Sequence, residues 1–272
     1  MKVLYLGDLV GRSGRDAAIA RLPELRERLK IDFTVVNGEN AAAGFGITAK
    51  ICDELFDEGT DAIVTGNHVW DNRDILAHFQ RENRLLRPLN FPAGTAGRGI
   101  GVYDVPGGRR ICVAQVMGRV FMDAMDCPFR GIDAALKPYP LGGAVNFTLV
   151  DIHAEATSEK MAMGHYLDGR ASMVVGTHTH VPTADCQILN DGTAYMTDVG
   201  MCGDFDSVIG MKKEEPIRRF IQKTPGQRFG PADGEGTVCG VFVESDDKTG
   251  KALRIEPVRV GPRLAETIPE VA

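Results

Sequence analysis

Short apolar, β-branched runs alternate with segments of helical periodicity over the first third of the chain. The runs span residues 2–6, 33–36 and 61–65, and the helical segments span 11–30, 48–57 and about 71–81. In the first helical segment, three- and four-residue spacing separates Ala18, Leu22, Leu25 and Leu29, which marks one buried face of a helix. Strand–helix alternation predicts parallel strand pairing in a layered α/β protein.

The rest of the chain predicts more strands, several of them in hairpins. We expect strands at 99–105, 110–115, 145–150, 172–175, 186–189, 193–197, 237–244 and 252–258, and helices near 132–136 and at 157–167. The run Asn190-Asp191-Gly192 is a strong hairpin turn. The segment 118–140 is long for an irregular connection, so we expect a lid or a partner contact there. No linker divides the sequence, and we expect residues 1–272 to form one domain.

Polar groups that can bind metals follow five of the predicted strands. They are Asp8, Glu39-Asn40, Asn67-His68, His153, and His178 with His180. Three of the six histidines of the chain fall in the last two of these places. Because ligands of parallel α/β sheets sit beyond the carboxyl ends of the strands, we expect these side chains to form one cluster at a sheet edge.

The donor types in this cluster predict a metal site. Three imidazoles and four oxygen donors, with no thiolate, favour iron, manganese, zinc or cobalt over a calcium site. Seven protein ligands exceed the needs of one open catalytic metal, and a bridging carboxylate between two ions accounts for the surplus. Glu39 is well placed to be that bridge.

The overall composition limits which molecules the protein can bind and where in the cell it is expected to lie. The net charge is −6, from 31 basic and 37 acidic residues, and an acidic surface argues against general binding to nucleic acids or anionic membranes. The six cysteines form no C-x-x-C pair, which is typical of reduced thiols. The first eight residues do not form a signal peptide, and no apolar run reaches 18 residues, so we expect a cytoplasmic protein.

The order of these motifs resembles that of the calcineurin-like metallophosphoesterases, which carry D-x-H, G-D, G-N-H, a lone His and G-H-x-H. The corresponding segments here are Asp8-Leu9-Val10, Gly38-Glu39-Asn40, Gly66-Asn67-His68, His153 and Thr177–His180. Val10 stands where the family usually has a histidine, and Glu39 replaces the bridging aspartate. With the runs Asn37–Ala41 and Asp198–Met201, these departures resemble the YmdB-like branch, and the likeness extends over nearly the whole chain.

The resemblance implies a layered fold of two mixed β-sheets flanked by helices, and a phosphodiesterase that hydrolyses small phosphodiesters such as 2′,3′-cyclic nucleotides. Iron is the metal it favours, with manganese, zinc or magnesium as alternatives, and Asn40 takes the place of the missing histidine. The expected ligands of one ion are Asp8, Glu39, Asn40 and His180; those of the other are Glu39, Asn67, His153 and His178. A hydroxide between the ions would attack phosphorus, and His68 would protonate the leaving oxygen.

Several alternatives stay open from the sequence. His68 could orient the substrate instead of acting as the acid, and Asp198 could either hold the His178–His180 loop or cap a turn. His78 and His165, inside predicted helices, are expected to be structural. The site could serve a phosphomonoesterase or a non-catalytic regulatory metal-binding protein. A homo-oligomer with 118–140 in a subunit contact is also compatible with the sequence.

Overall fold

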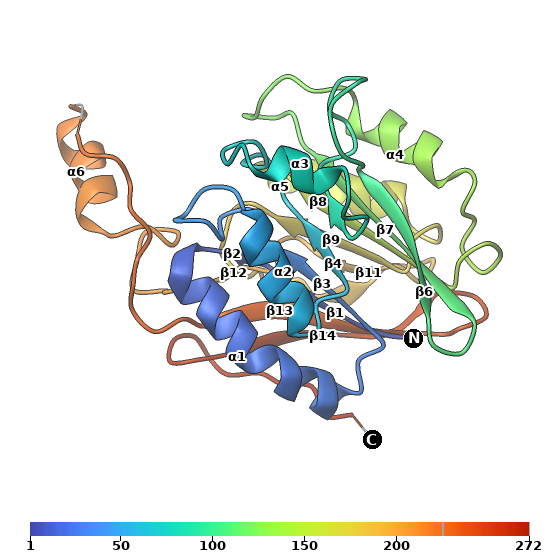
Figure 1. Cartoon of the computed structure of the whole chain (residues 1–272). Coiled ribbons are helices and arrows are strands. Elements are labelled where there is room, and N and C mark those ends of the chain that lie inside the picture. Colours follow the sequence, from blue (N-terminus) through green and yellow to red (C-terminus); the bar gives the residue numbers. More distant parts are fainter. Residues whose placement is uncertain (225, 272) are drawn as a thin grey trace.

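Two six-stranded sheets pack face to face in the computed structural model, which describes residues 1–224 and 226–271 (Figure 1). In spatial order, the first sheet consists of β14 (Ala252–Val260), β13 (Val238–Ser245), β1 (Lys2–Leu6), β3 (Phe33–Asn37), β4 (Ala62–Val64) and β5 (Leu85–Leu86). Strands β1, β3, β4 and β5 are parallel, whereas β13 pairs antiparallel with β1 and β14. The first sheet is therefore mixed.

The second sheet is mixed as well. In spatial order it consists of β10 (Gln187–Ile188), β11 (Ala194–Met196), β9 (Met173–Thr177), β8 (Phe147–His153), β7 (Arg109–Met117) and β6 (Ile100–Val105). Its four central strands are parallel, and β6 and β10 are antiparallel edges. A short parallel pair, β2 (Asp8–Leu9) with β12 (Met201–Cys202), lies beside the first sheet.

Helices cover the outer faces of both sheets. The first sheet is covered by α1 (Gly11–Leu29), α2 (Ala49–Asp57) and α3 (Ile75–Phe79), and the second by α4 (Pro128–Leu136) and α5 (Thr157–Tyr166). The inner faces share one apolar core, in which Tyr5, Val35 and Val64 of the first sheet pack against Leu149 and Val175 of the second. Burial of alternate residues on each strand is what joins the two layers.

The expected fold class is thus confirmed, although some elements differ. The helix expected at about 71–81 is only Ile75–Phe79, because turns occupy the residues before it. The helix expected near 132–136 begins earlier, at Pro128, a residue suited to a first helical turn. The segment 118–140 places Ile132 and Leu136 in the core against the second sheet.

One long excursion was not expected from the sequence. Residues 205–224 and 226–231, hereafter the arm, carry α6 (Glu214–Gln222) away from the layered body (Figure 1). The base of the arm is closed by an antiparallel bridge between Met211 and Pro231. No helix among the described residues is long and apolar enough to cross a membrane.

Candidate metal centre

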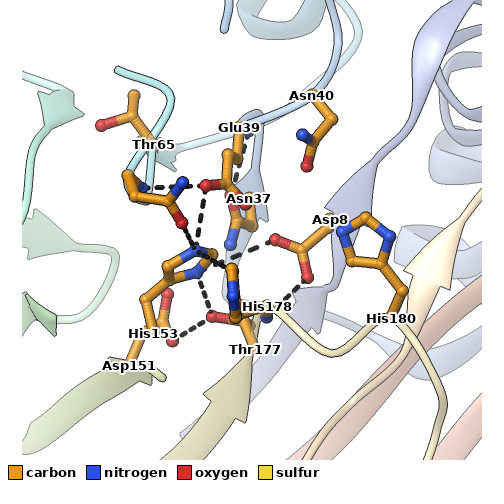
Figure 2. A network of polar contacts seen from close by, with 12 residues as sticks. Asp8, Asn37, Glu39, Asn40, Thr65, Asp151, His153, Thr177, His178 and His180 are labelled. Atoms are coloured by element: carbon orange, nitrogen blue, oxygen red, sulfur yellow. Dashed lines mark hydrogen bonds and ion pairs between the residues drawn. The ribbon is translucent and has the colours of Figure 1, made fainter. Parts of the chain in front are cut away.

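The polar strand ends of the two sheets meet at one edge of the sandwich (Figure 2). Asp8 begins β2 just after β1, Glu39 follows β3, and Asn67 follows β4. His153 is the last residue of β8, and His178 follows β9. The structure brings these groups together with His180, and Figure 2 shows Asn40 at the edge of the same cluster.

The first group of atoms surrounds Nε2 of His153. This nitrogen lies 2.9 Å from Oε1 of Glu39, 2.9 Å from Oδ1 of Asn67 and 3.1 Å from Nδ1 of His178. The two oxygens have lone pairs. The two imidazole nitrogens have one only if the proton of each ring lies on its other nitrogen, and the hydrogen-bond partners of the rings indicate where it lies.

The partners of both rings place the protons on the opposite nitrogens. Nδ1 of His153 lies 2.8 Å from Oγ1 of Thr177, which itself donates to Oδ1 of Asp151 at 2.8 Å, so that Nδ1 carries the proton. Nε2 of His178 lies 3.3 Å from Oε2 of Glu155, which assigns its proton to Nε2. Burial lowers the pKa of His153 to about 4 and the pKa of His178 to about 3. Both rings are therefore neutral at pH 7, the form that binds metals.

The second group comprises Asp8, Glu39 and His180. Nδ1 of His180 donates to the carbonyl of Ile209 at 2.8 Å, which leaves Nε2 as a lone pair. Oδ1 of Asp8 and Oδ1 of Asn40 are buried without a hydrogen-bond partner. Burial raises the pKa of Asp8 to about 7, His180 opposes that rise, and the nearby charge of Glu39 adds to it.

These observations fit the binding of metal cations. Lone pairs of Glu39, Asn67, His153 and His178 face one another, and buried oxygens of Asp8 and Asn40 have no donor. Such crowding of acceptors costs free energy unless a cation lies between them. Glu39 belongs to both groups of candidate ligands.

The backbone around Glu39 is shaped for this position. Oε1 of Glu39 accepts hydrogen bonds from the backbone N–H groups of Asn67, at 2.8 Å, and His68, at 3.2 Å. Gly66 precedes them with a φ of 63°, and a Cβ atom there would lie 2.5 Å from Oε1 of Glu39. Only glycine gives both the left-handed turn and the close approach.

A buried polar network fixes the orientation of His153. Oδ2 of Asp151 accepts from the hydroxyl of Tyr5 at 2.7 Å and from Nε2 of Gln115 at 2.6 Å. Oε1 of Gln115 in turn accepts from the backbone N–H of Gly66 at 3.0 Å. The network joins β1 to β8 and connects the turn before Asn67 with the strand that ends at His153. Hydrogen-bonded supports of this kind orient metal-binding histidines.

The His178–His180 loop has a strained backbone. His178 and His180 have φ angles of 91° and 66°, which cost free energy in residues other than glycine. Oδ2 of Asp198 accepts from the backbone N–H of Thr179 at 3.1 Å and from Nζ of Lys160 at 2.7 Å. The side chains of Lys160 and Asp198 are 1% and 0% exposed. This buried ion pair therefore stabilises the loop through the hydrogen bond between Asp198 and Thr179.

Some contributors to the site were missed by the sequence analysis. Nothing in the sequence indicates that Lys160 is buried, because an isolated lysine in a helix is usually a surface residue. Glu155 could have been identified from its position, two residues after His153. Asp198 adopts both of the arrangements that the sequence left open, because its Oδ1 also accepts from the N–H of Gly200 in the following turn at 2.8 Å. His165 is exposed on α5, and His78 is buried in α3; neither belongs to the cluster.

A cavity of about 630 Å³ opens over the cluster. His68 lines it, with a side chain that is 30% exposed and with Nδ1 2.9 Å from Oδ2 of Asp71. The arm supplies much of the remaining wall, including Ile209, Phe220 and Phe229. Among the described residues that line this cavity, none lies within 118–140.

Comparison with known proteins gives a consistent result. The family model described as "YmdB-like protein" matches residues 4–258. The chain is 46% identical over 260 residues to the 2′,3′-cyclic-nucleotide 2′-phosphodiesterase of Bacillus subtilis, covering 96% of this chain and 97% of that protein. It is 35% identical over 267 residues to a putative phosphatase/phosphodiesterase of Mycoplasma pneumoniae, covering 96% and 93% of the two chains.

Two solved structures are similar over almost their full length. A hypothetical protein from Thermus thermophilus superposes with a TM-score of 0.90 and 41% identity, covering 97% of this chain and 100% of that one. A protein from Mycoplasma pneumoniae, described as a novel phosphatase, gives a TM-score of 0.88 and 34% identity, covering 96% and 93%.

Proposed function

The chain belongs to the YmdB-like protein family, and from this membership we propose that it is a dinuclear metal-dependent phosphodiesterase that hydrolyses 2′,3′-cyclic nucleotides. The observation that carries the proposal is the crowding of buried lone-pair donors in two groups that share Glu39. The Bacillus subtilis relative is named for this activity.

We propose the ligand sets expected from the sequence. Asp8, Glu39, Asn40 and His180 would hold one ion, and Glu39, Asn67, His153 and His178 the other. The two groups of candidate ligands match this division, because Asp8 and His180 fall in one and His153 and His178 in the other. Mixed nitrogen and oxygen donors suit iron, manganese, zinc or cobalt. The resemblance to the YmdB-like branch favours iron among these metals, with manganese, zinc or magnesium as alternatives.

Bound metal ions would supply a nucleophile at neutral pH and would neutralise charge on the phosphoryl oxygens. The protein supplies the proton for the leaving group. Asp71 accepts the hydrogen bond from Nδ1 of His68, which leaves Nε2 to exchange a proton with the departing ribose oxygen. The ring of Phe45 packs edge-on against His68 at 5.1 Å and steadies it over the cavity.

A phosphomonoesterase on the same site is the second candidate, because the Mycoplasma pneumoniae structure is described as a phosphatase. The cavity favours diesters, since its apolar wall offers room for an esterified group beyond the phosphate. The phosphate of a monoester would contact only the polar part of the cavity lining, which includes Glu39, His68 and His180. We therefore expect diesters to be hydrolysed faster than monoesters.

The experiment compares metal-loaded protein on adenosine 2′,3′-cyclic monophosphate, bis-p-nitrophenyl phosphate and adenosine 3′-monophosphate. We expect hydrolysis of the two diesters, loss of activity with a chelator, and loss in His180→Ala. His165→Ala is the matched control, because His165 is an exposed histidine outside the cluster. Faster hydrolysis of the monoester would favour the phosphomonoesterase, and tight metal binding without turnover of any substrate would favour a regulatory protein.

A further inference from the structure

The cavity over the metal centre has two chemically different halves. Its floor is polar and includes Glu39, His68 and His180. The rest of its lining, hereafter the wall, is mostly apolar and comes largely from the arm, through Val208, Ile209, Met211, Pro216, Phe220 and Phe229. A phosphate group needs only the floor, so the apolar wall matches a different part of the substrate.

Two aromatic rings of this wall differ in how they are held. Phe229 packs with Met211 in an apolar cluster, and the guanidinium of Arg219 covers its ring at 3.9 Å from the centroid. Phe220, one helical position beyond Arg219, is 81% exposed. An exposed phenylalanine at the rim of a cavity gains free energy when an apolar group covers it.

Two of the three guanidinium nitrogens of Arg219, the polar side chain that the arm contributes to the wall, donate hydrogen bonds within the arm. Nε of Arg219 donates to Oε1 of Glu215 at 3.0 Å, and Nη2 donates to the carbonyl of Gln227 at 2.6 Å. The other described residues that the arm contributes to the wall have apolar side chains. Such a surface can stack a flat ring but carries few groups to read hydrogen-bonding edges.

The wall is also held at a fixed position above the metal centre. The carbonyl of Ile209, at the turn where the arm begins, accepts the hydrogen bond from Nδ1 of His180 at 2.8 Å. Val10 packs beneath the same turn with Met201 and Met211. A direct hydrogen bond therefore joins Ile209, which lines the apolar wall, to His180, which belongs to the polar cluster.

We propose that the arm is the nucleobase subsite of the enzyme, in which the base of a cyclic nucleotide stacks against Phe220 and the adjoining wall while the cyclic phosphate lies on the polar floor. This inference rests on the proposed phosphodiesterase function. It assigns the arm to substrate recognition and explains an exposed aromatic ring beside the site. Because the wall offers stacking more than hydrogen bonds, purine and pyrimidine nucleotides are both substrates.

The test compares two substrates that differ only in the base. These are adenosine 2′,3′-cyclic monophosphate and ribose 2′,3′-cyclic phosphate, assayed with the metal-loaded full chain. The wild-type protein is expected to favour the nucleotide in kcat/KM, and Phe220→Ala to reduce that preference about tenfold, through KM, as expected for the loss of one base–aromatic stack. The matched control is Ile221→Ala, which removes a neighbouring exposed side chain that is not among the lining residues and should leave the preference unchanged.

A second measurement separates failure of this inference from failure of the proposed function. Calorimetric titration compares adenosine 2′-monophosphate with ribose 2-phosphate, which differ only in the base, for the wild-type protein and for Phe220→Ala. Tighter binding of the nucleotide that is lost in Phe220→Ala supports the subsite even if neither cyclic phosphate is hydrolysed. Equal use of both cyclic substrates, or a preference that Phe220→Ala does not change, overturns the subsite while leaving the phosphodiesterase intact.

Discussion

The backbone N–H of His178 donates to Oδ2 of Asp8 at 3.1 Å, across 170 positions of sequence. This bond joins the loop after β9 of the second sheet to β2, which lies beside the first. It also occupies one carboxylate oxygen of Asp8, whereas the other, Oδ1, is buried without a hydrogen-bond partner. The same carboxylate thus holds the histidine loop and presents a free oxygen to the cluster.

Asp8→Asn tests the role of that free oxygen. An amide keeps the shape of the side chain and can still accept from His178, but it loses the negative charge. We expect the variant to fold, to lose one metal ion, and to fall more than about 100-fold in kcat/KM, beyond the range seen for indirect supports of metal sites. Metal analysis and steady-state kinetics measure both effects, and wild-type metal content with wild-type activity would show that Asp8 is not a ligand.

Lys160→Met tests the buried ion pair beneath the histidine loop. The substitution leaves the charge of Asp198 buried and unpaired, and we expect the free energy of unfolding to fall by about 3–5 kcal/mol. Lys160→Met combined with Asp198→Asn should recover part of that loss, because no uncompensated charge remains. Denaturant unfolding measures the three variants.

The control for this pair is Lys50→Met, whose side chain is 86% exposed. It should leave the free energy of unfolding close to that of the wild-type protein. A Lys160→Met variant as stable as Lys50→Met would contradict a supporting role for the pair.

His68→Gln tests the proton donor. A general acid matters most when the leaving oxygen is a poor leaving group, so the variant should lose about 10²–10⁴-fold in kcat on a cyclic nucleotide. It should lose much less on bis-p-nitrophenyl phosphate, whose leaving group needs no proton. Metal content should stay unchanged, and equal losses on the two substrates would instead indicate that His68 positions the phosphate.

The ion pair between Asp32 and Arg109 predicts a pH-dependent contribution to stability. Partial burial of Asp32 raises its pKa, but hydrogen bonds from Arg109 and from the backbone N–H of Lys2 outweigh it and lower the pKa below its usual value. The folded state therefore favours the charged form. Its contribution is complete above the pKa of the unfolded chain, about 4, and is lost as the pH falls through the lower pKa of the folded state.

Asp32→Asn should accordingly lower the free energy of unfolding at pH 7 by about 1 kcal/mol or less, because the pair is partly exposed to solvent. The difference from the wild-type protein should shrink as the pH falls below about 4. Thermal unfolding across this range measures it, with Glu235→Gln, an exposed carboxyl group, as the control. A difference that is constant with pH would show that the effect is not electrostatic.

The strand ends within each sheet were predictable because chain direction constrains them. Parallel strands of one sheet deliver their carboxyl ends to one edge, so Asp8, Glu39 and Asn67 could be grouped without coordinates. His153 ends a strand of the second sheet, and its position beside them depends on how the two sheets pack. The structure places these residues together. The YmdB-like family was likewise identified correctly from its motifs. The metal-binding roles of these residues stay predictions.

The sequence could not predict the buried ion pair beneath the His178–His180 loop or the arm, and in each case the reason is physical. Lys160 and Asp198 are 38 positions apart, and a buried lysine has no local pattern that distinguishes it from a surface one. The arm depends on contacts of Met211 and Phe229 with Val10, near the other end of the chain. Helical periodicity in nine residues of α6 does not reveal which cavity the helix borders.

The proposed phosphodiesterase requires Glu39 to lie between two metal ions. Anomalous scattering from metal-loaded crystals, recorded at the iron, manganese and zinc edges, tests it most directly, because it identifies and locates each ion. We expect two ions about 3.5–4 Å apart, with carboxylate oxygens of Glu39 touching both, His180 on one and His153 on the other. A single ion, or two ions of which neither touches Glu39, would contradict it.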